Sequence, residues 1–221
     1  MLISHPLEHS GEATAVAVLH SPHAGAAAAA WQRALPTLQG LRLTLRELRM
    51  EDAPSLLAHL SSEEVTRFIS PPPTTVDGFE QFIAWAQRRR GQGRYACFAV
   101  VPEGEDQAVG MFQMHVLDAD EQRAEWGFVL GSAYWGKGLF LEGAVMMLRF
   151  MFETVGIELL EARSVVENGR GNGALRKVGA LRQRALRRSF KKDGRLHDQW
   201  LWTITPGQWK ASIQLRSRTA H

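Results

Sequence analysis

The chain has 221 residues, 45% of them apolar and 22% charged, an ordinary globular composition that can bury a full core. The formal charge of +3 is small and dispersed, so it does not indicate a nucleic-acid partner, and no stretch reaches the roughly eighteen apolar residues of a membrane span. The single cysteine, Cys97, excludes a disulfide framework and a cysteine-based zinc site and suits a reducing, cytoplasmic location.

Residues 1–38 differ in composition from the rest of the chain. They hold three prolines, four of the eight histidines and a run of alanines from Ala26 to Ala30, with little apolar periodicity. We expect a low-complexity extension with one helix from Ala26 to Leu35, followed by one domain at 39–210 and a tail at 211–221. The histidines lack the spacing of a helical metal pair, so no metal site is predicted.

Regular patterns begin at Leu41. Leu41, Leu43 and Leu45 alternate with polar residues, which predicts a half-buried strand. Helix starts follow at Met50–Pro54, at Ser61–Glu64 and at Thr75–Asp77. Three apolar runs at 95–101, 107–116 and 123–130 are separated by short turns, so we expect antiparallel neighbours.

A glycine-rich turn leads from the third of these strands into a helix. Phe128, Val129 and Leu130 end the strand, and Gly136-Lys137-Gly138 precede an apolar face of Leu141, Val145, Leu148, Phe152 and Val155. Free N–H groups at such a helix start bind phosphate well, although the glycines would equally serve only to turn the chain. The spacing fits neither a Walker A loop nor a dinucleotide fingerprint.

The remaining elements complete an α+β order. A strand at 159–167, a helix at 171–178 and two strands at 181–190 and 196–205 follow, the last two joined by the hairpin signal Asp193-Gly194. We predict a mixed, mostly antiparallel central sheet of about seven strands with helices on both faces. Asn168 stands where its amide would either cap the helix or reach a bound group.

Two segments resemble one family. Trp135-Gly136-Lys137-Gly138-Leu139-Phe140 is similar to the pyrophosphate loop of the GCN5-related N-acetyltransferases (the GNAT family), Arg/Gln-x-x-Gly-x-Gly/Ala, although Trp135 replaces Arg/Gln and Phe140 a small residue. Glu167 to Ala180 resembles the family's Asn-x-x-Ser-x-x-x-x-x-Lys-x-Gly segment, in which Asn168, Lys177 and Gly179 match and Gly171 replaces serine. Glu125, Tyr134 and Glu142 add a likeness to the Rim-type branch, which includes ribosomal-protein acetyltransferases.

The resemblance implies a fold, an acyl donor and a set of binding residues. It implies the GNAT fold, in which two splayed strands receive the pantetheine arm of acetyl-CoA as co-substrate. The residues that it assigns to acetyl-CoA binding are Phe128, Val129, Leu130, Trp135, Gly136, Lys137, Gly138, Leu139, Phe140, Asn168, Gly171 and Asn172.

The same resemblance implies direct transfer of an acetyl group to an amine. We expect Glu125 to be the general base, with Glu167 as the second candidate, while an exposed or salt-bridged Glu125 is the structural alternative. The family's usual tyrosine acid is replaced by Leu175. Either His115, Ser164, His197 or solvent would protonate the thiolate, or no acid is needed because the CoA thiol is already fairly acidic.

Three functions remain open from the sequence. They are an N-acetyltransferase, a non-catalytic acyl-CoA-binding or regulatory module, and a nucleic-acid-associated domain. Only the arginine clusters support the third. We expect the first, with a small mono-amine or a protein N-terminus as acceptor. We expect no nucleic-acid or membrane partner, and the chain could form a homodimer.

Overall fold

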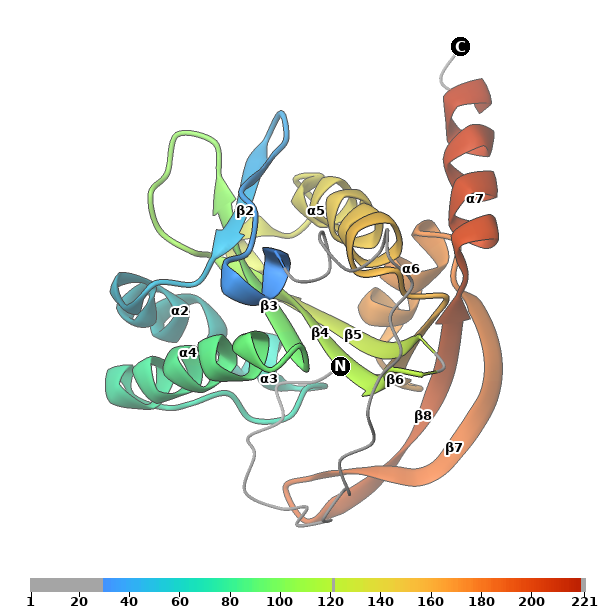
Figure 1. The fold of residues 1–221 in the computed structure, drawn as a ribbon. Coiled ribbons are helices and arrows are strands. Elements are labelled where there is room, and N and C mark those ends of the chain that lie inside the picture. Colours follow the sequence, from blue (N-terminus) through green and yellow to red (C-terminus); the bar gives the residue numbers. More distant parts are fainter. Residues whose placement is uncertain (1–29, 121, 220–221) are drawn as a thin grey trace.

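The structure, a computed structural model, describes residues 30–120 and 122–219 and shows a twisted sheet between helices (Figure 1). In this part of the chain the strands are β1 (Leu38–Gln39), β2 (Leu43–Glu47), β3 (Tyr95–Pro102), β4 (Gly110–Asp118), β5 (Arg123–Leu130), β6 (Leu159–Val165), β7 (Leu181–Lys192) and β8 (Arg195–Ile204). The helices are α2 (Ala53–Leu60), α3 (Glu63–Thr66), α4 (Val76–Gly91), α5 (Leu139–Arg149), α6 (Gly169–Lys177) and α7 (Pro206–Thr219). Shorter helical turns lie at η1 (Met50–Asp52), η2 (Ser132–Tyr134) and η3 (Phe150–Val155), the last with π-helical hydrogen bonding.

The sheet confirms the predicted α+β class. Its eight strands lie in the order β1-β2-β3-β4-β5-β6-β8-β7, and among the described pairs only β5 and β6 run parallel. The strand beyond the predicted seven is the two-residue β1. Asp193 and Gly194 both have positive φ, 48° and 76°, as the predicted hairpin turn requires.

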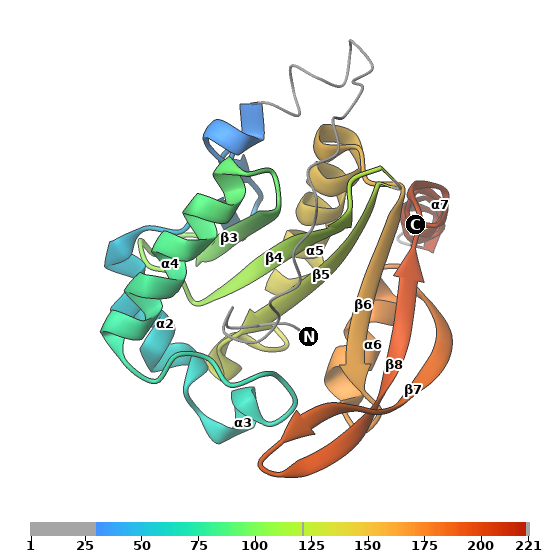
Figure 2. The same cartoon turned by 60° about the horizontal axis from the view of Figure 1, so that its bottom comes forward.

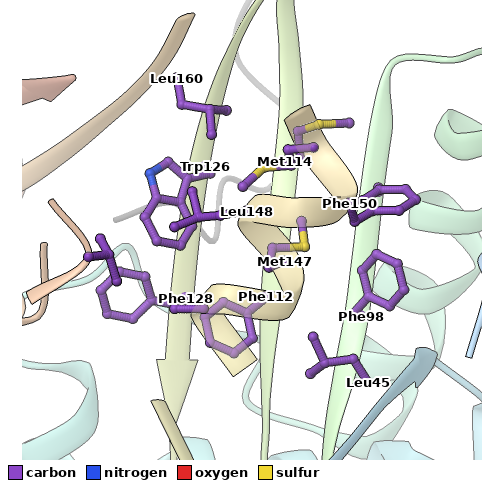
Figure 3. Close-up of a cluster of buried hydrophobic side chains, with 14 of the residues drawn as sticks. Leu45, Phe98, Phe112, Met114, Trp126, Phe128, Met147, Leu148, Phe150 and Leu160 are labelled. Carbon is purple, nitrogen blue, oxygen red and sulfur yellow. The ribbon is translucent and has the colours of Figure 1, made fainter. Parts of the chain in front are cut away.

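Helices cover both faces of the sheet, and each face has its own core. On one face α5 lies across β4 and β5, where Phe112, Phe128, Met147 and Leu148 pack together (Figure 3). On the other face α2 and α4 pack on β3 and β4. Because side chains alternate along a strand, the side chains of β5 point in turn to one face of the sheet and to the other.

The buried side of α5 differs from the predicted stripe. Leu148 and Phe152 are buried as expected, but Leu141, Val145 and Val155 are only half-buried. The fully covered residues at the start of the helix are instead Leu139, Gly143, Ala144 and Met147. Gly143 lies so close to Phe112 that a Cβ there would fall 2.6 Å from the ring, so the small residues, and not only the large ones, mark the contact face.

The domain extends further at both ends than the predicted boundaries. Trp31 is 3% exposed and meets Phe150 edge to face, and Leu35 is also buried, so residues 30–38 belong to the packed domain. The remainder of the predicted extension, and the start of its helix, lie outside the described residues. At the other end the segment assigned to a tail is the continuation of α7, whose Trp209 packs on Phe152.

Candidate functional site

Strands β5 and β6 are hydrogen-bonded over three residue pairs only. The pairing ends at Glu125 with Glu161, after which β5 stays with β4 as far as Leu130 and β6 stays with β8 as far as Val165. The two strands therefore diverge (Figure 2). Phe128, Val129 and Leu130, predicted to bind the cofactor, lie on this diverging half of β5, where no β6 strand satisfies their outer backbone groups.

A row of polar side chains crosses the sheet where the divergence begins. The register aligns Tyr95, His115, Glu125 and Glu161 on four neighbouring strands. Tyr95 belongs to the core under α4, so the whole row faces the α2 and α4 side. Directly paired residues have Cβ atoms about 5 Å apart, which puts His115 and Glu161 on either side of Glu125.

Glu125 is a buried carboxylate that forms an ion pair with Arg163. Its side chain is 3% exposed, and its Oε2 accepts a hydrogen bond from Arg163 Nη1 at 3.0 Å. Burial raises the pKa of Glu125, and the Arg163 guanidinium opposes that shift. Arg163 also lies 3.7 Å from Glu161. Glu125 is thus both buried and salt-bridged, a combination that keeps a carboxylate basic without leaving its charge uncompensated.

The other proton-transfer candidates occupy different positions. Burial lowers the pKa of His115, and the nearby Arg89 and Arg94 lower it further, so its imidazole is neutral at pH 7. Glu167 is exposed and lies in the turn after β6, which ends at Val165, whereas Glu125 pairs with Glu161, four residues before that end, so the structure does not bring it to Glu125.

The alternative acid positions lie away from this row. Ser164 is buried on the opposite face of β6, with no hydrogen-bond partner for its hydroxyl among the described residues. His197 lies on the β7–β8 hairpin against Phe190. Leu175, at the place of the tyrosine, is a 2% exposed core residue and offers no proton.

The start of α5 is open to an anion. Gly136 and Gly138 have φ of 77° and 84°, a left-handed conformation that glycine adopts without strain. Gly138 is the N-cap of the helix and supplies no side-chain cap, so the first N–H groups of α5, which include Leu139 and Phe140, have no partner within the helix. A Cβ at Gly136 would have open space around it.

In the segment 134–140, which leads into α5, some side chains pack into the core and others lie at the helix start. Leu139 is buried, and the Phe140 ring packs 4.5 Å from that of Phe128. Trp135 is half-buried against both cores, and its indole donates to the Leu130 carbonyl at 2.9 Å. Lys137 lies over the Tyr134 ring at 5.2 Å. The backbone therefore faces the anion site, while the large side chains fix the loop.

Asn168 and Asn172 have structural partners. Asn168 caps α6 by accepting from Gly171 N at 2.9 Å. Asn172 donates to the carbonyls of Val165 and Val166 and accepts from the Trp202 indole. Both the nitrogen and the oxygen of the Asn172 amide therefore have hydrogen-bond partners. Gly171 allows the cap, because a Cβ there would lie 2.6 Å from the Asn168 amide nitrogen.

Sequence reasoning missed three cations at this site. Arg163 holds Glu125, as described above. Arg42 follows the β1–β2 turn, pairs with Glu142 at 3.6 Å and lies near Gly138. Arg170, in the first turn of α6, stacks over the Trp135 ring at 3.9 Å. Each contact joins segments distant in sequence, so no local pattern reveals it.

The helix start and the carboxylate lie on opposite faces. The start of α5 lies on the face that α5 covers, whereas Glu125 faces α2 and α4. The divergence of β5 and β6 connects the two faces, because no strand pairing closes it beyond Glu125. A thioester bound on the α5 side can therefore meet a nucleophile that enters from the α2 and α4 side.

A cavity of about 480 Å³ lies outside this centre. It runs between α6 and the β7–β8 hairpin and is lined by Arg176, Arg182, Trp200 and Trp202 among others, on the face opposite Glu125. Within residues 30–120 and 122–219 we find neither a helix long and apolar enough to cross a membrane nor a group of three potential metal-binding side chains.

A family model described as "Acetyltransferase (GNAT) domain" matches residues 42–181. The curated relatives include "Uncharacterized N-acetyltransferase p20" of Bacillus licheniformis, which is 28% identical over 171 residues, covering 77% of this chain and 96% of the relative. Another is "Putative ribosomal N-acetyltransferase YdaF" of Bacillus subtilis, 23% identical over 76% of this chain and 93% of its own length.

Among solved structures, this chain is similar in fold to Mycobacterium smegmatis RimJ in complex with CoA-disulfide. The TM-score is 0.74 at 22% identity, over 83% of this chain and 95% of that one. A GCN5-related N-acetyltransferase from Brucella melitensis gives a TM-score of 0.70 at 20% identity, over 81% and 82% of the two chains. At these identities the structures show a shared fold.

Proposed function

This chain belongs to the GNAT family of acetyltransferases, and we propose that it transfers the acetyl group of acetyl-CoA to a primary amine, either a small mono-amine or a protein N-terminus. The observation that carries the proposal is the divergence of β5 from β6 directly after Glu125. It joins an uncapped helix start on one face of the sheet to a buried carboxylate on the other.

The α5 side would hold the acyl donor. The N–H groups of Gly138, Leu139 and Phe140 would bind its pyrophosphate, with the charge of Lys137 nearby. The backbone groups of Phe128 and Leu130 that point away from β4 would bind the pantetheine arm, except for the Leu130 carbonyl, which accepts from Trp135. We assign Asn168 and Gly171 to the turn that shapes the β6 side of the donor site. The Asn172 amide already has hydrogen-bond partners, which supports a structural role for that residue.

The transfer itself needs a neutral amine and a place for its proton. The amine nitrogen attacks the thioester carbonyl carbon, the carbon–sulfur bond breaks, and the sulfur leaves as a thiolate. Glu125 takes the proton that the amine loses, directly or through water, with the neutral His115 beside it as a relay. Glu167 is exposed and distant from Glu125, which makes it the weaker candidate.

The acceptor would enter between α3 and the β7–β8 hairpin. The hairpin, residues 181–204, holds seven Lys and Arg and two Asp, a charge of +5, whereas the whole chain carries +3. A polyamine would therefore meet net repulsion on that side. A mono-amine with an apolar or anionic body fits better, and so does a protein N-terminus. All residues named here come from one chain, in agreement with either a monomer or a homodimer.

An acceptor panel tests this proposal. Release of free thiol from acetyl-CoA should be faster with mono-amines and N-terminal peptides than with spermine, measured at moderate salt and equal concentration of reactive amine. A clear preference for spermine would refute the acceptor assignment while leaving acetyl transfer in place. Thiol release without any acceptor requirement would contradict the proposed reaction.

A further inference from the structure

The anion-binding loop lacks a side-chain donor at its first position. Trp135 stands where the family's loop carries Arg or Gln, and its one donor, the indole N–H, is already bonded to the Leu130 carbonyl. A pyrophosphate at the start of α5 would therefore meet backbone N–H groups but no guanidinium from the loop itself.

Arg170, which follows β6, brings a guanidinium next to Trp135. Its guanidinium carbon lies 3.9 Å from the centre of the Trp135 ring, close enough for a strong cation–π contact. Trp135 follows the end of β5 and Arg170 follows the end of β6, so the stack bridges the far ends of the two diverging strands.

We infer that Arg170 is a phosphate-binding residue of the acyl-CoA site, held in position by Trp135. A guanidinium that contacts an indole through its central carbon leaves N–H groups at its edge, where they can make paired hydrogen bonds to a phosphate. Arg170 is exposed and has no ion pair among the described residues, so its N–H groups are accessible to an anion. This inference rests on the proposed function.

The neighbouring cations are less available for this role. Arg42 is paired with Glu142, whose carboxylate also accepts from the backbone N–H groups of Leu41 and Arg42. Lys137 lies over the Tyr134 ring and, like Arg170, has no carboxylate partner among the described residues. It would add a point charge, whereas Arg170 presents the planar guanidinium that can make paired hydrogen bonds to a phosphate.

The test compares a donor that has phosphates with one that lacks them. Arg170→Ala should raise the Kd of CoA by roughly tenfold, as expected for loss of a charged hydrogen bond, measured by titration calorimetry. The KM of acetyl-pantetheine, a thioester without phosphates, should be unchanged. Arg149→Ala is the matched control: it removes the same charge from the exposed far end of α5 and should alter neither value.

A second variant tests the substitution at position 135. Adding Trp135→Arg to Arg170→Ala should restore much of the CoA affinity, because the guanidinium then comes from the loop. Unchanged CoA affinity in Arg170→Ala would overturn the inference, and so would an equal loss for acetyl-pantetheine. If the unmodified protein bound no CoA at all, the proposed function would fail, and the Arg170 assignment with it.

Discussion

Glu125 lies at the last residue pair between β5 and β6, and its chemistry depends on a side chain from the neighbouring strand. Arg163 is 3.0 Å away and lowers the carboxyl pKa, while burial raises it by more. The balance of these opposed effects sets the pH below which Glu125 is protonated and, in its proposed role, could no longer accept the proton of the amine.

Replacing Arg163 should therefore move the pH profile of the enzyme. Arg163→Gln removes the cation that lowers the Glu125 pKa, so that pKa rises and the acidic limb of kcat/KM moves to higher pH. Arg163→Lys keeps the positive charge and should stay close to the original profile. An acidic limb that does not move in Arg163→Gln would show that Glu125 is not the group that titrates.

The sequence located Glu125 and the capping Asn168 but not Arg163, which pairs with Glu125. Local patterns place a residue on a strand or a helix end, and both residues are where those patterns put them. The bond from the Trp202 indole to Asn172 and the stack of Arg170 on Trp135 join segments 30 or more residues apart. Such contacts follow from the sheet order, which no local pattern contains.

At the scale of elements, the proposed donor site depends on the join between β5 and α5. Two left-handed glycines bring the chain into the helix with its first N–H groups uncapped. From the glycines alone the sequence predicted either a turn or an anion site at this join, and only the family resemblance favoured the anion site. The sequence pattern misplaced the apolar stripe of α5, where small residues form the closest contacts with the sheet.

Closing that helix start should abolish donor binding. Gly138→Val forces a β-branched residue into a left-handed conformation with φ of 84° and places its side chain at the phosphate position, so the Kd of acetyl-CoA should rise at least tenfold. Gly194→Val is the control, since its φ is 76° and its surroundings are open, but it lies in the hairpin turn. Equal affinities in calorimetry for the two variants would refute the loop assignment.

At the scale of the whole molecule, the sheet consists of two halves joined by three residue pairs. The half from β1 to β5 carries Glu125 and the start of α5, and the half from β6 to β8 carries Arg163 and Arg170. The site needs both halves. The strand order was predictable only through the family resemblance, since turn signals give antiparallel neighbours but not the one parallel contact.

The described N-terminal segment stabilises the first half. Because Trp31 is 3% exposed and packs on Phe150, Trp31→Ala should lower the free energy of unfolding by about 3–5 kcal/mol, and deletion of residues 1–36 should destabilise the fold at least as much. The composition of 1–38 predicted an extension outside the domain. Leu41→Ala, at a side chain 88% exposed, is the control for urea denaturation. Equal midpoints for the two substitutions would contradict the assignment of Trp31 to the core.

The central claim is that this chain transfers acetyl from acetyl-CoA to an amine with Glu125 as the base. The most direct measurement is mass spectrometry of an N-terminal peptide acceptor incubated with acetyl-CoA and either the unmodified protein or Glu125→Gln. We predict that the unmodified protein adds one acetyl group to the peptide, and that Glu125→Gln does so at least tenfold more slowly while calorimetry shows the same acetyl-CoA affinity. Equal rates for the two proteins would contradict the role of Glu125, and an unacetylated peptide with no thiol released for any amine would contradict the transfer itself.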